Sequence, residues 1–219
     1  MYREKNEMEE LTLERALSLL PLRERNSHKG SFGSVLAVAG SGWYRGAASL
    51  AVEGALRAGA GIVTLASVEP VLAAVAARLP ECCLCPCERG AEDGIAPGPG
   101  NLDRIRRQKA TVLLLGPGIG SSSLSAARGQ ESKRLTETLV NGFPGSALLD
   151  ADGLNAAALL LAEGKPFPHP AGELIVTPHP GEMARLTGVS AAEFNRSDES
   201  RAKIAQEYAK RWNAVVVLK

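Results

Sequence analysis

Short apolar runs alternate with helix-prone segments along most of this chain. The runs lie at Ser34–Ala39, Ile62–Ala66, Thr111–Leu115, Ala147–Asp150, Leu174–Thr177 and Ala214–Leu218. Strands that are buried on both faces are continuously apolar, and this pattern is typical of a mostly parallel sheet covered by helices. The alternation therefore predicts an α/β fold, and 219 residues suffice for one domain with a sizeable core.

Helices are expected between these runs. They are predicted at Glu9–Leu20, Ala47–Ala58, Pro70–Arg78, around Glu131–Val140, at Leu154–Ala162, in a short segment that ends at Leu186, and at Asp198–Arg211. The stretch Glu88–Gly100 is rich in Gly, Pro and acidic residues, and this composition favours a loop.

Charge and hydropathy argue against two classes of partner. The formal net charge is +1, so no global field attracts nucleic acid or an anionic membrane. No apolar run approaches the roughly 20 residues that a membrane-spanning helix needs. The N-terminal stretch 1–17 is charged and lacks the apolar segment of a secretory signal. We therefore expect a cytoplasmic protein that binds neither nucleic acid nor membrane.

All four cysteines fall in one short segment, at Cys82, Cys83, Cys85 and Cys87. Clustered thiolates can bind zinc or an iron–sulfur cluster, but no second Cys pair or nearby His completes such a ligand set. The alternate spacing is typical of a strand in which Cys acts as a small hydrophobe. We expect a short strand here, without a metal and without a disulfide.

Five of the apolar runs lead directly into conspicuous segments. These are GSGWYRG (40–46), GPGIG (116–120), DADGLN (150–155), TPHPGE (177–182) and Lys219. Parallel sheets bind ligands beyond the carboxyl ends of their strands, so the five segments are expected to share one edge. The spacing G-x-G-x-x-x-G, with no acidic residue after the next strand, argues against an NAD-dependent dehydrogenase.

Two carboxylates stand at the end of one run. Asp150 and Asp152 are two residues apart, and in an extended segment they would point in similar directions. They could then hold a metal through water or orient polar groups. The alternative is that Asp152 only caps the following helix.

The segment TPHPGE contains a histidine between two prolines. The prolines restrain the backbone of His179, as a positioned hydrogen-bonding group requires. Glu182 falls in the first turn of the next helix, where it could cap the helix, complement its dipole or bind a metal-linked phosphate. His28 and His169 lie in loop-like contexts and are interpreted as surface residues.

Four segments, in this order, resemble the ADP-dependent NAD(P)H-hydrate dehydratases. They are HKGSFGSVLAVAGSGWYRGAASLAVEGALRAGAGIVTLA (28–66), LLLGPGIG, LLDADGLNA and IVTPHPGEMARLTG. The resemblance runs from about Leu11 to Lys219. It implies a ribokinase-like fold with three α/β/α layers and a mostly parallel sheet. The implied activity uses ADP or ATP to dehydrate the S-epimer of hydrated NAD(P)H: the nucleotide phosphorylates the added hydroxyl, and loss of phosphate restores the double bond.

The same resemblance implies site residues. By position, Ala47, Gly118 and His179 would contact the hydrated nicotinamide nucleotide. His179 stands where related kinases carry the Asn of an N-x-x-E motif, and Glu182 is the shared acid. Lys219 resembles the first residue of a segment along the phosphates of the adenine nucleotide, ADP or ATP with Mg²⁺. The resemblance implies no metal ligands on the protein itself.

One departure from the family pattern concerns catalysis. The family carries a GTGD segment that supplies an anion hole and the expected catalytic Asp, and this segment is not among the printed residues. We therefore expect residues 1–219 to form a single ribokinase-like domain that is incomplete at its C-terminus, with its catalytic Asp beyond Lys219. Without that base and anion hole, the 219 residues alone are predicted to be inactive.

Two alternatives stay open. One is a kinase of the same fold that acts on thiazole or pyrimidine vitamin precursors, because a shared fold does not decide the reaction. The other is a non-catalytic nucleotide-binding subunit. The family's companion is an NAD(P)H-hydrate epimerase, and the roughly 25 residues before the first motif are too few to form that domain, so a separate epimerase is the expected functional partner. A homo-oligomer is also expected.

Overall fold

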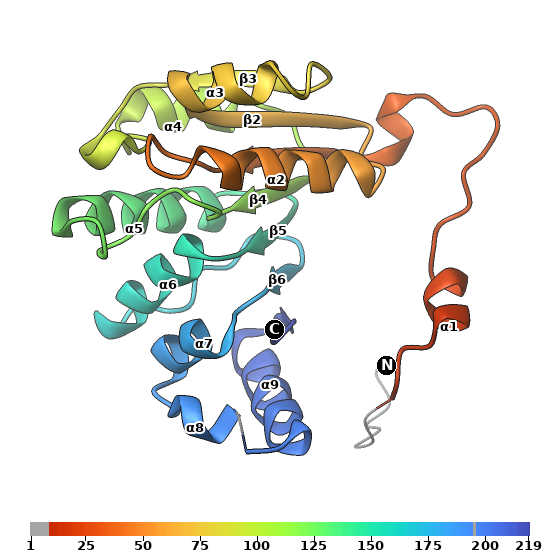
Figure 1. Ribbon diagram of the computed structural model, residues 1–219, viewed down its shortest axis with the longest axis vertical. Coiled ribbons are helices and arrows are strands. Elements are labelled where there is room, and N and C mark those ends of the chain that lie inside the picture. The colour runs from red at the N-terminus through yellow and green to blue at the C-terminus, as the bar shows by residue number, and fades with distance from the viewer. Residues whose placement is uncertain (1–8, 195) are drawn as a thin grey trace.

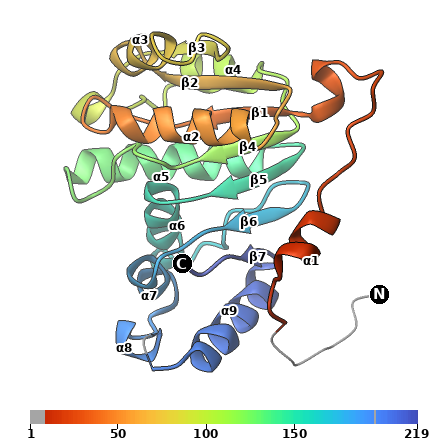
Figure 2. The same cartoon turned by 45° about the vertical axis from the view of Figure 1, so that its right-hand side comes forward.

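One parallel sheet forms the centre of the protein. The computed structural model describes residues 9–194 and 196–219, and the predictions for residues 1–8 lie outside this range. The strands are β1 (Ser34–Val38), β2 (Ile62–Val68), β3 (Cys83–Cys87), β4 (Val112–Leu115), β5 (Ser146–Leu149), β6 (Leu174–Val176) and β7 (Val215–Val216). In the described chain they lie in the order β3-β2-β1-β4-β5-β6-β7, visible from two sides in Figures 1 and 2. Each predicted run is confirmed as a strand, although β7 is much shorter than its run.

The direction of the chain reverses at the middle of the sheet. From β1 the chain moves outward through β2 to β3, then crosses back to β4 and continues outward to β7. β1 therefore pairs in parallel with both β2 and β4, with Leu36 opposite Thr64 and Leu113. Such a switch point, between β1 and β4, is where ligands bind in open α/β sheets. The side chains of Leu36, Leu65 and Leu113 are buried, so the sheet forms an aliphatic core.

Helices cover both faces of this sheet. They are α1 (Leu13–Ser18), α2 (Arg45–Arg57), α3 (Glu69–Ala76), α4 (Pro99–Arg106), α5 (Ala126–Asn141), α6 (Asp152–Ala162), α7 (Pro180–Thr187), α8 (Ala191–Phe194) and α9 (Asp198–Trp212), with short 3₁₀ turns at Lys29–Phe32 and Ala91–Asp93. α2 packs with α3, whereas α4 to α7 contact one another in succession. Right-handed crossovers put these two sets on opposite faces, and Figure 1 shows α2 in front of the sheet and α4 behind it. The predicted three-layer α/β/α architecture is confirmed.

The predicted end of the loop Glu88–Gly100 is wrong, because helix α4 already begins at Pro99. A proline fits the first turn of a helix, where its missing N–H has no partner to lose. Asn101 of α4 is buried, and its amide bonds the backbone of Glu88 and Ala96. Tertiary contacts therefore stabilise a helix that composition alone disfavours. Helix α8 was also not predicted.

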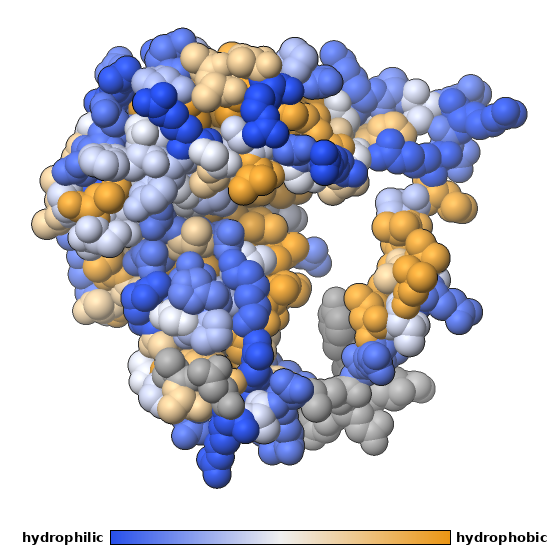
Figure 3. All heavy atoms as spheres, viewed as in Figure 1, coloured by the Kyte–Doolittle hydropathy of each residue, from blue (hydrophilic) through white to orange (hydrophobic). Residues whose placement is uncertain are grey.

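The N-terminal helix is the least packed element of the described chain. The helix predicted at Glu9–Leu20 is shorter in the structure, where α1 covers only Leu13–Ser18. None of the residues of α1 is buried. Leu13 is 76% exposed, and Figure 3 shows apolar side chains along this helix, which stands apart from the sheet. No helix among the described residues is long and apolar enough to cross a membrane.

The cysteine segment forms the edge strand β3, as predicted. Cys85 and Cys87 are buried and Cys83 is exposed, so the thiols serve as small apolar side chains. Burial raises the pKa of Cys82, just before the strand, to about 11, which keeps this thiol protonated at neutral pH. Among residues 9–194 and 196–219, no group of three or more His, Cys, Asp or Glu side chains could hold a metal ion.

Candidate functional site

The glycine-rich turns after β1 and β4 touch at the switch point. The Gly40 N–H donates to the Pro117 carbonyl at 2.8 Å. Gly118 is buried with φ +68°, and a Cβ built on it would lie 2.8 Å from the Cβ atoms of both Ala47 and Tyr44. The structure therefore brings Ala47, in the first turn of α2, against Gly118. Two of the three predicted substrate-binding residues are neighbours.

The turn GPGIG also packs against the segment DADGLN after β5. A Cβ on Gly116 would lie only 1.9 Å from the Asp150 carbonyl oxygen, so only a glycine allows this approach. At the other end of the turn, the Gly120 N–H donates to Asp152 Oδ2 at 2.9 Å. The two segments form one surface made largely of backbone.

The two aspartates of DADGLN point to different partners. Ala151 between them has φ 50° and ψ −118°, a conformation that non-glycine residues rarely adopt. Asp150 Oδ1 accepts hydrogen bonds from Thr177 Oγ1 at 2.7 Å and Lys219 Nζ at 2.8 Å, whereas Asp152 bonds the turn after β4. The expectation of similar directions is therefore wrong. The capping alternative is wrong by one residue, because Ala151 is the N-cap and Asp152 begins α6.

Asp152 starts a chain of hydrogen bonds that the sequence did not reveal. Its Oδ1 accepts from Asn155 Nδ2 at 3.2 Å, and Asn155 Oδ1 accepts from Arg185 Nε at 2.9 Å. Asn155 lies one turn after Asp152 on α6, a spacing that could have suggested the first bond. Arg185 comes from α7, and nothing in the sequence pairs it with α6.

His179 and Glu182 cap each other at the start of α7. His179 Nδ1 accepts from the Gly181 N–H at 3.0 Å, and Glu182 Oε2 accepts from the His179 N–H at 2.9 Å. His179 Nε2 lies 3.3 Å from Glu182 Oε1, with the histidine side chain 50% and the glutamate side chain 6% exposed. The capping role suggested for Glu182 is confirmed, and one face of the His179 ring stays open to a ligand.

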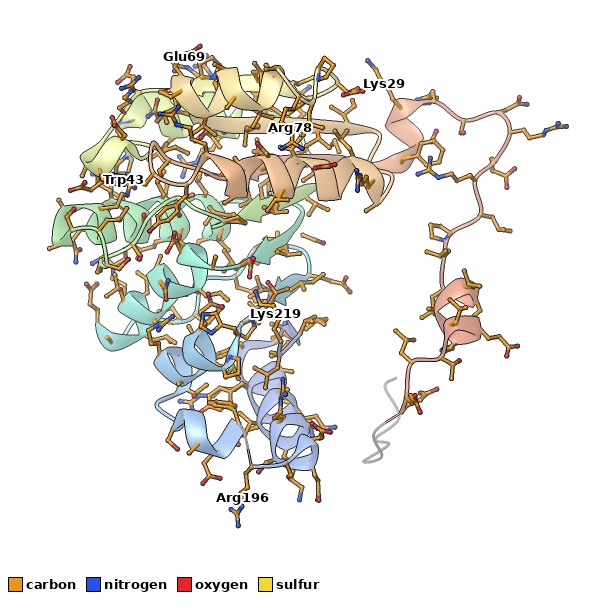
Figure 4. The ribbon with its side chains drawn as sticks, viewed as in Figure 1. Lys29, Trp43, Glu69, Arg78, Arg196 and Lys219 are labelled. Carbon is orange, nitrogen blue, oxygen red and sulfur yellow. The ribbon has the colours of Figure 1, made fainter. Side chains whose placement is uncertain are left out.

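Lys219 lies beside the TPHPGE segment. Its N–H donates to the Pro178 carbonyl at 2.9 Å, and its ammonium group bonds Asp150. Figure 4 shows Lys219 close to α7. In the same view, Trp43 lies at one end of the sheet, in the turn after β1, and Lys29 lies at the opposite end. Lys219 is thus joined to the segments after β5 and β6. Among the described residues, no hydrogen bond joins His179 to Ala47 or Gly118.

A buried arginine was missed altogether. Arg128 of α5 is fully buried, and its guanidinium donates to Ser132 Oγ and to the carbonyls of Ala91 and Ile95 at 3.1–3.3 Å. It also pairs with Glu131 at 3.0 Å. Burial lowers the pKa of Arg128, although the nearby carboxylates oppose this shift.

Arg128 connects the two glycine-rich turns through its partners. Ser132 Oγ donates to the Gly120 carbonyl at 2.7 Å. The 91–95 loop that Arg128 holds also reaches the turn after β1, where the Asp93 carbonyl accepts from the Gly42 N–H at 3.0 Å. A single buried cation therefore fixes the relative positions of both turns.

The other two histidines lie away from this edge. His28 is exposed, as predicted, and caps the 3₁₀ turn before β1 through a 3.0 Å bond from the Gly30 N–H. His169 is only partly exposed, and its Nε2 lies 3.0 Å from the Asn213 carbonyl oxygen. His169 lies in a loop at the surface, as predicted, and its ring bridges the loop before β6 and the end of α9.

Residues 35–219 match a family model described as NAD(P)H-hydrate dehydratase. A bifunctional NAD(P)H-hydrate repair enzyme from Moorella thermoacetica is 39% identical over 92% of this chain and 36% of its own length. The ADP-dependent (S)-NAD(P)H-hydrate dehydratase of Listeria monocytogenes is 33% identical over 82% of this chain and 58% of its own.

A solved structure agrees with these sequence matches. The ADP/ATP-dependent NAD(P)H-hydrate dehydratase of Bacillus subtilis, co-crystallised with ATP and Mg²⁺, superposes with a TM-score of 0.71 at 29% identity. The match covers 95% of this chain and 65% of that one. The chain thus spans about a third of the length of the bifunctional relative and less than two thirds of the two dehydratases.

Proposed function

This chain belongs to the NAD(P)H-hydrate dehydratase family, and we propose that it takes part in the ADP- or ATP-dependent dehydration of the S-epimer of hydrated NAD(P)H. In this reaction the hydroxyl oxygen of the hydrated ring attacks the terminal phosphorus of the nucleotide. Phosphate then leaves with the former hydroxyl oxygen, and a proton is lost as the ring double bond returns. ADP yields AMP and phosphate, and ATP yields ADP and phosphate.

One observation carries the proposal. The four segments that resemble the family and Lys219 follow β1, β4, β5, β6 and β7, which are five consecutive neighbours in the sheet. Their carboxyl ends therefore share one edge, which includes the switch point. Ala47, Gly118 and His179 are proposed to bind the hydrated nicotinamide nucleotide there, with backbone contacts from the first two and a directed ring nitrogen from the third.

Lys219 is proposed to bind the phosphates of the adenine nucleotide. Its ammonium group is a compact point charge that lies beside Asp150. Mg²⁺ accompanies nucleotide phosphates and takes oxygen ligands. The donor set fits such an ion, because Asp150 Oδ2 accepts no hydrogen bond from the described residues and can face its water shell. The metal would neutralise phosphate charge, while Asp150 holds Lys219 in place.

Three further features belong to the proposal: a cytoplasmic location, a homo-oligomeric assembly and cooperation with an NAD(P)H-hydrate epimerase. The Moorella relative is named as a bifunctional repair enzyme, which supports the link with a second repair step. Light scattering of the purified protein measures the assembly directly.

The proposed activity is tested in a protein that also carries the family's GTGD segment, by the recovery of NADH absorbance from S-hydrated NADH with Mg²⁺ and either ADP or ATP. The expected result is NADH formation that requires the nucleotide and yields equimolar phosphate. Phosphorylation of thiazole or pyrimidine vitamin precursors, without NADH formation, would assign the protein to the kinases of this fold. Nucleotide binding with neither reaction would favour a non-catalytic subunit.

A further inference from the structure

A polar cleft of about 480 Å³ lies next to the turn after β4. Ser121, Ser122 and Ser123 line one side, and Asp152, Asn155 and Arg185 line the other. The serines directly follow GPGIG and lead into α5, whose N-cap is Ser125. Gly129 and Ser132 of α5 also line the cleft, so its wall includes the first two turns of this 16-residue helix, the end whose dipole favours an anion.

Arg185 supplies the charge that such an anion needs. Its Nε donates a hydrogen bond to Asn155, and Asn155 donates one to Asp152. These two bonds fix the orientation of the guanidinium. Within residues 9–194 and 196–219, neither terminal nitrogen of Arg185 has a protein partner, and the side chain is exposed. A guanidinium with two free donors suits a phosphate group.

The carboxylate in this cleft does not cancel that charge. Asp152 accepts one hydrogen bond at each oxygen, from the Gly120 N–H and from Asn155 Nδ2. The buried Arg128 guanidinium lies close enough to Asp152 for their charges to interact. Asp152 is therefore a structural acceptor with a cation nearby, and Arg185 presents the only side-chain cation that lines the cleft in the described structure.

The cleft adjoins the proposed nicotinamide site on two sides. A Cβ on Gly181 would lie 2.9 Å from the His179 ring and 3.9 Å from Arg185 NH1, so the two groups are at most about 7 Å apart, the sum of those distances. The turn after β4 makes the second link, since Gly118 belongs to the nicotinamide site and Ser121 lines the cleft. A ligand whose ring contacts His179 can thus continue into the cleft.

We propose that this cleft binds the diphosphate bridge of the dinucleotide, with Arg185 as the specificity-determining residue. The inference rests on the proposed function, because it takes the nicotinamide end to lie at Ala47, Gly118 and His179. In the dinucleotide, one ribose separates the nicotinamide ring from the diphosphate. In the protein, the cleft lies directly beside the residues proposed to bind that ring. Arg185 would then favour ligands that carry this diphosphate over the phosphate-free nicotinamide riboside.

The test measures binding of NADH by the full protein through fluorescence titration. Arg185→Gln is expected to raise the Kd for NADH about tenfold or more, since it removes charge-assisted hydrogen bonds. Arg185→Lys should give an intermediate value, because it keeps the charge but loses the bond to Asn155. Arg107→Gln, an exposed arginine at the end of α4 outside the cleft, is the matched control and should stay within about twofold.

Related ligands separate the possible sources of the phosphate. Reduced nicotinamide riboside carries no phosphate, so Arg185→Gln should change its Kd less than twofold. Weaker binding of NADPH alone would assign the cleft to the 2′-phosphate, and weaker binding of ATP alone would assign it to the co-substrate; either result overturns the proposal. So does an unchanged Kd for NADH, or a wild-type protein that does not bind NADH. If Arg185→Gln weakens NADH binding while a protein that also carries the GTGD segment does not convert hydrated NADH, the subsite stands and the proposed activity fails.

Discussion

The carboxyl edge of the sheet has two halves that are built in different ways. After β1 and β4, glycine backbone is packed so closely that Gly116 and Gly118 have no room for a Cβ. After β5, β6 and β7, the surface consists of hydrogen-bonded side chains such as Asp150, His179 and Lys219. An added atom in the first half must displace backbone, whereas a lost side chain in the second half removes one or two hydrogen bonds. Substitutions should therefore affect mainly stability in the first half and mainly ligand affinity in the second.

The largest effect is expected from Gly116→Ala. The new Cβ would lie 1.9 Å from the Asp150 carbonyl oxygen and 2.6 Å from the Gly153 nitrogen, at φ +129°. We expect a loss of about 4 kcal/mol or more in the free energy of unfolding, or no folded protein, measured by urea titration with circular dichroism. Gly164→Ala is the control, because Gly164 also has positive φ (+75°) but nothing within 4 Å. It should cost about 1 kcal/mol. Equal losses for both variants would show that the loss of stability comes from backbone strain at positive φ and not from close packing.

The second effect concerns the cation that joins the two turns. Arg128→Met removes a fully buried guanidinium and leaves the Ile95 carbonyl unpaired, while the Ala91 carbonyl keeps only its bond from the Gly94 N–H. Loss of one partner from such a network should reduce the free energy of unfolding by about 3 kcal/mol. Arg134→Met, at an exposed position on the same helix, should change it by less than about 0.5 kcal/mol. Similar unfolding midpoints for Arg128→Met and wild type would refute the structural role of this cation.

Sequence patterns could predict the first half of the edge better than the second. Buried aliphatic runs identify strands, and glycine-rich segments after them identify the turns. The direction of Asp150 depends on the unusual φ of Ala151, which no residue type signals in advance. Arg128 stands in a stretch of Ser, Ala and Gly, a composition that is typical of a solvent-exposed helix N-terminus. Its burial follows from the 91–95 loop, which comes from a distant part of the chain.

The third effect tests the side-chain half directly. Lys219→Met removes the ammonium group beside Asp150, and the Kd for ADP should rise about tenfold, or roughly 1.4 kcal/mol. The free energy of unfolding should fall by less than about 1 kcal/mol, because the Lys219 side chain is about half exposed and Asp150 keeps its bond from Thr177. Lys210→Met, in the last turn of α9, is the charge-matched control and should leave ADP binding unchanged. Calorimetric titration of both variants measures the difference. Equal ADP affinities would remove Lys219 from the nucleotide site.

The smallest expected effect on ligand use gives the finest test, because the chain contains the same cap twice. His179 and His28 each accept a 3.0 Å hydrogen bond at Nδ1 from the N–H two residues later, and each belongs to a capping box. Either histidine replaced by Ala should lower the free energy of unfolding by about 1 kcal/mol, the usual value of an N-cap. Only His179 stands at the carboxyl edge, so in a protein that also carries the family's GTGD segment only His179→Ala should also weaken the use of hydrated NADH. The loss of one directed hydrogen bond of about 1 kcal/mol corresponds to roughly a fivefold lower kcat/KM. Since the two variants lose the same local structure, a shared decrease in kcat/KM would trace the effect to stability and exclude His179 from the site.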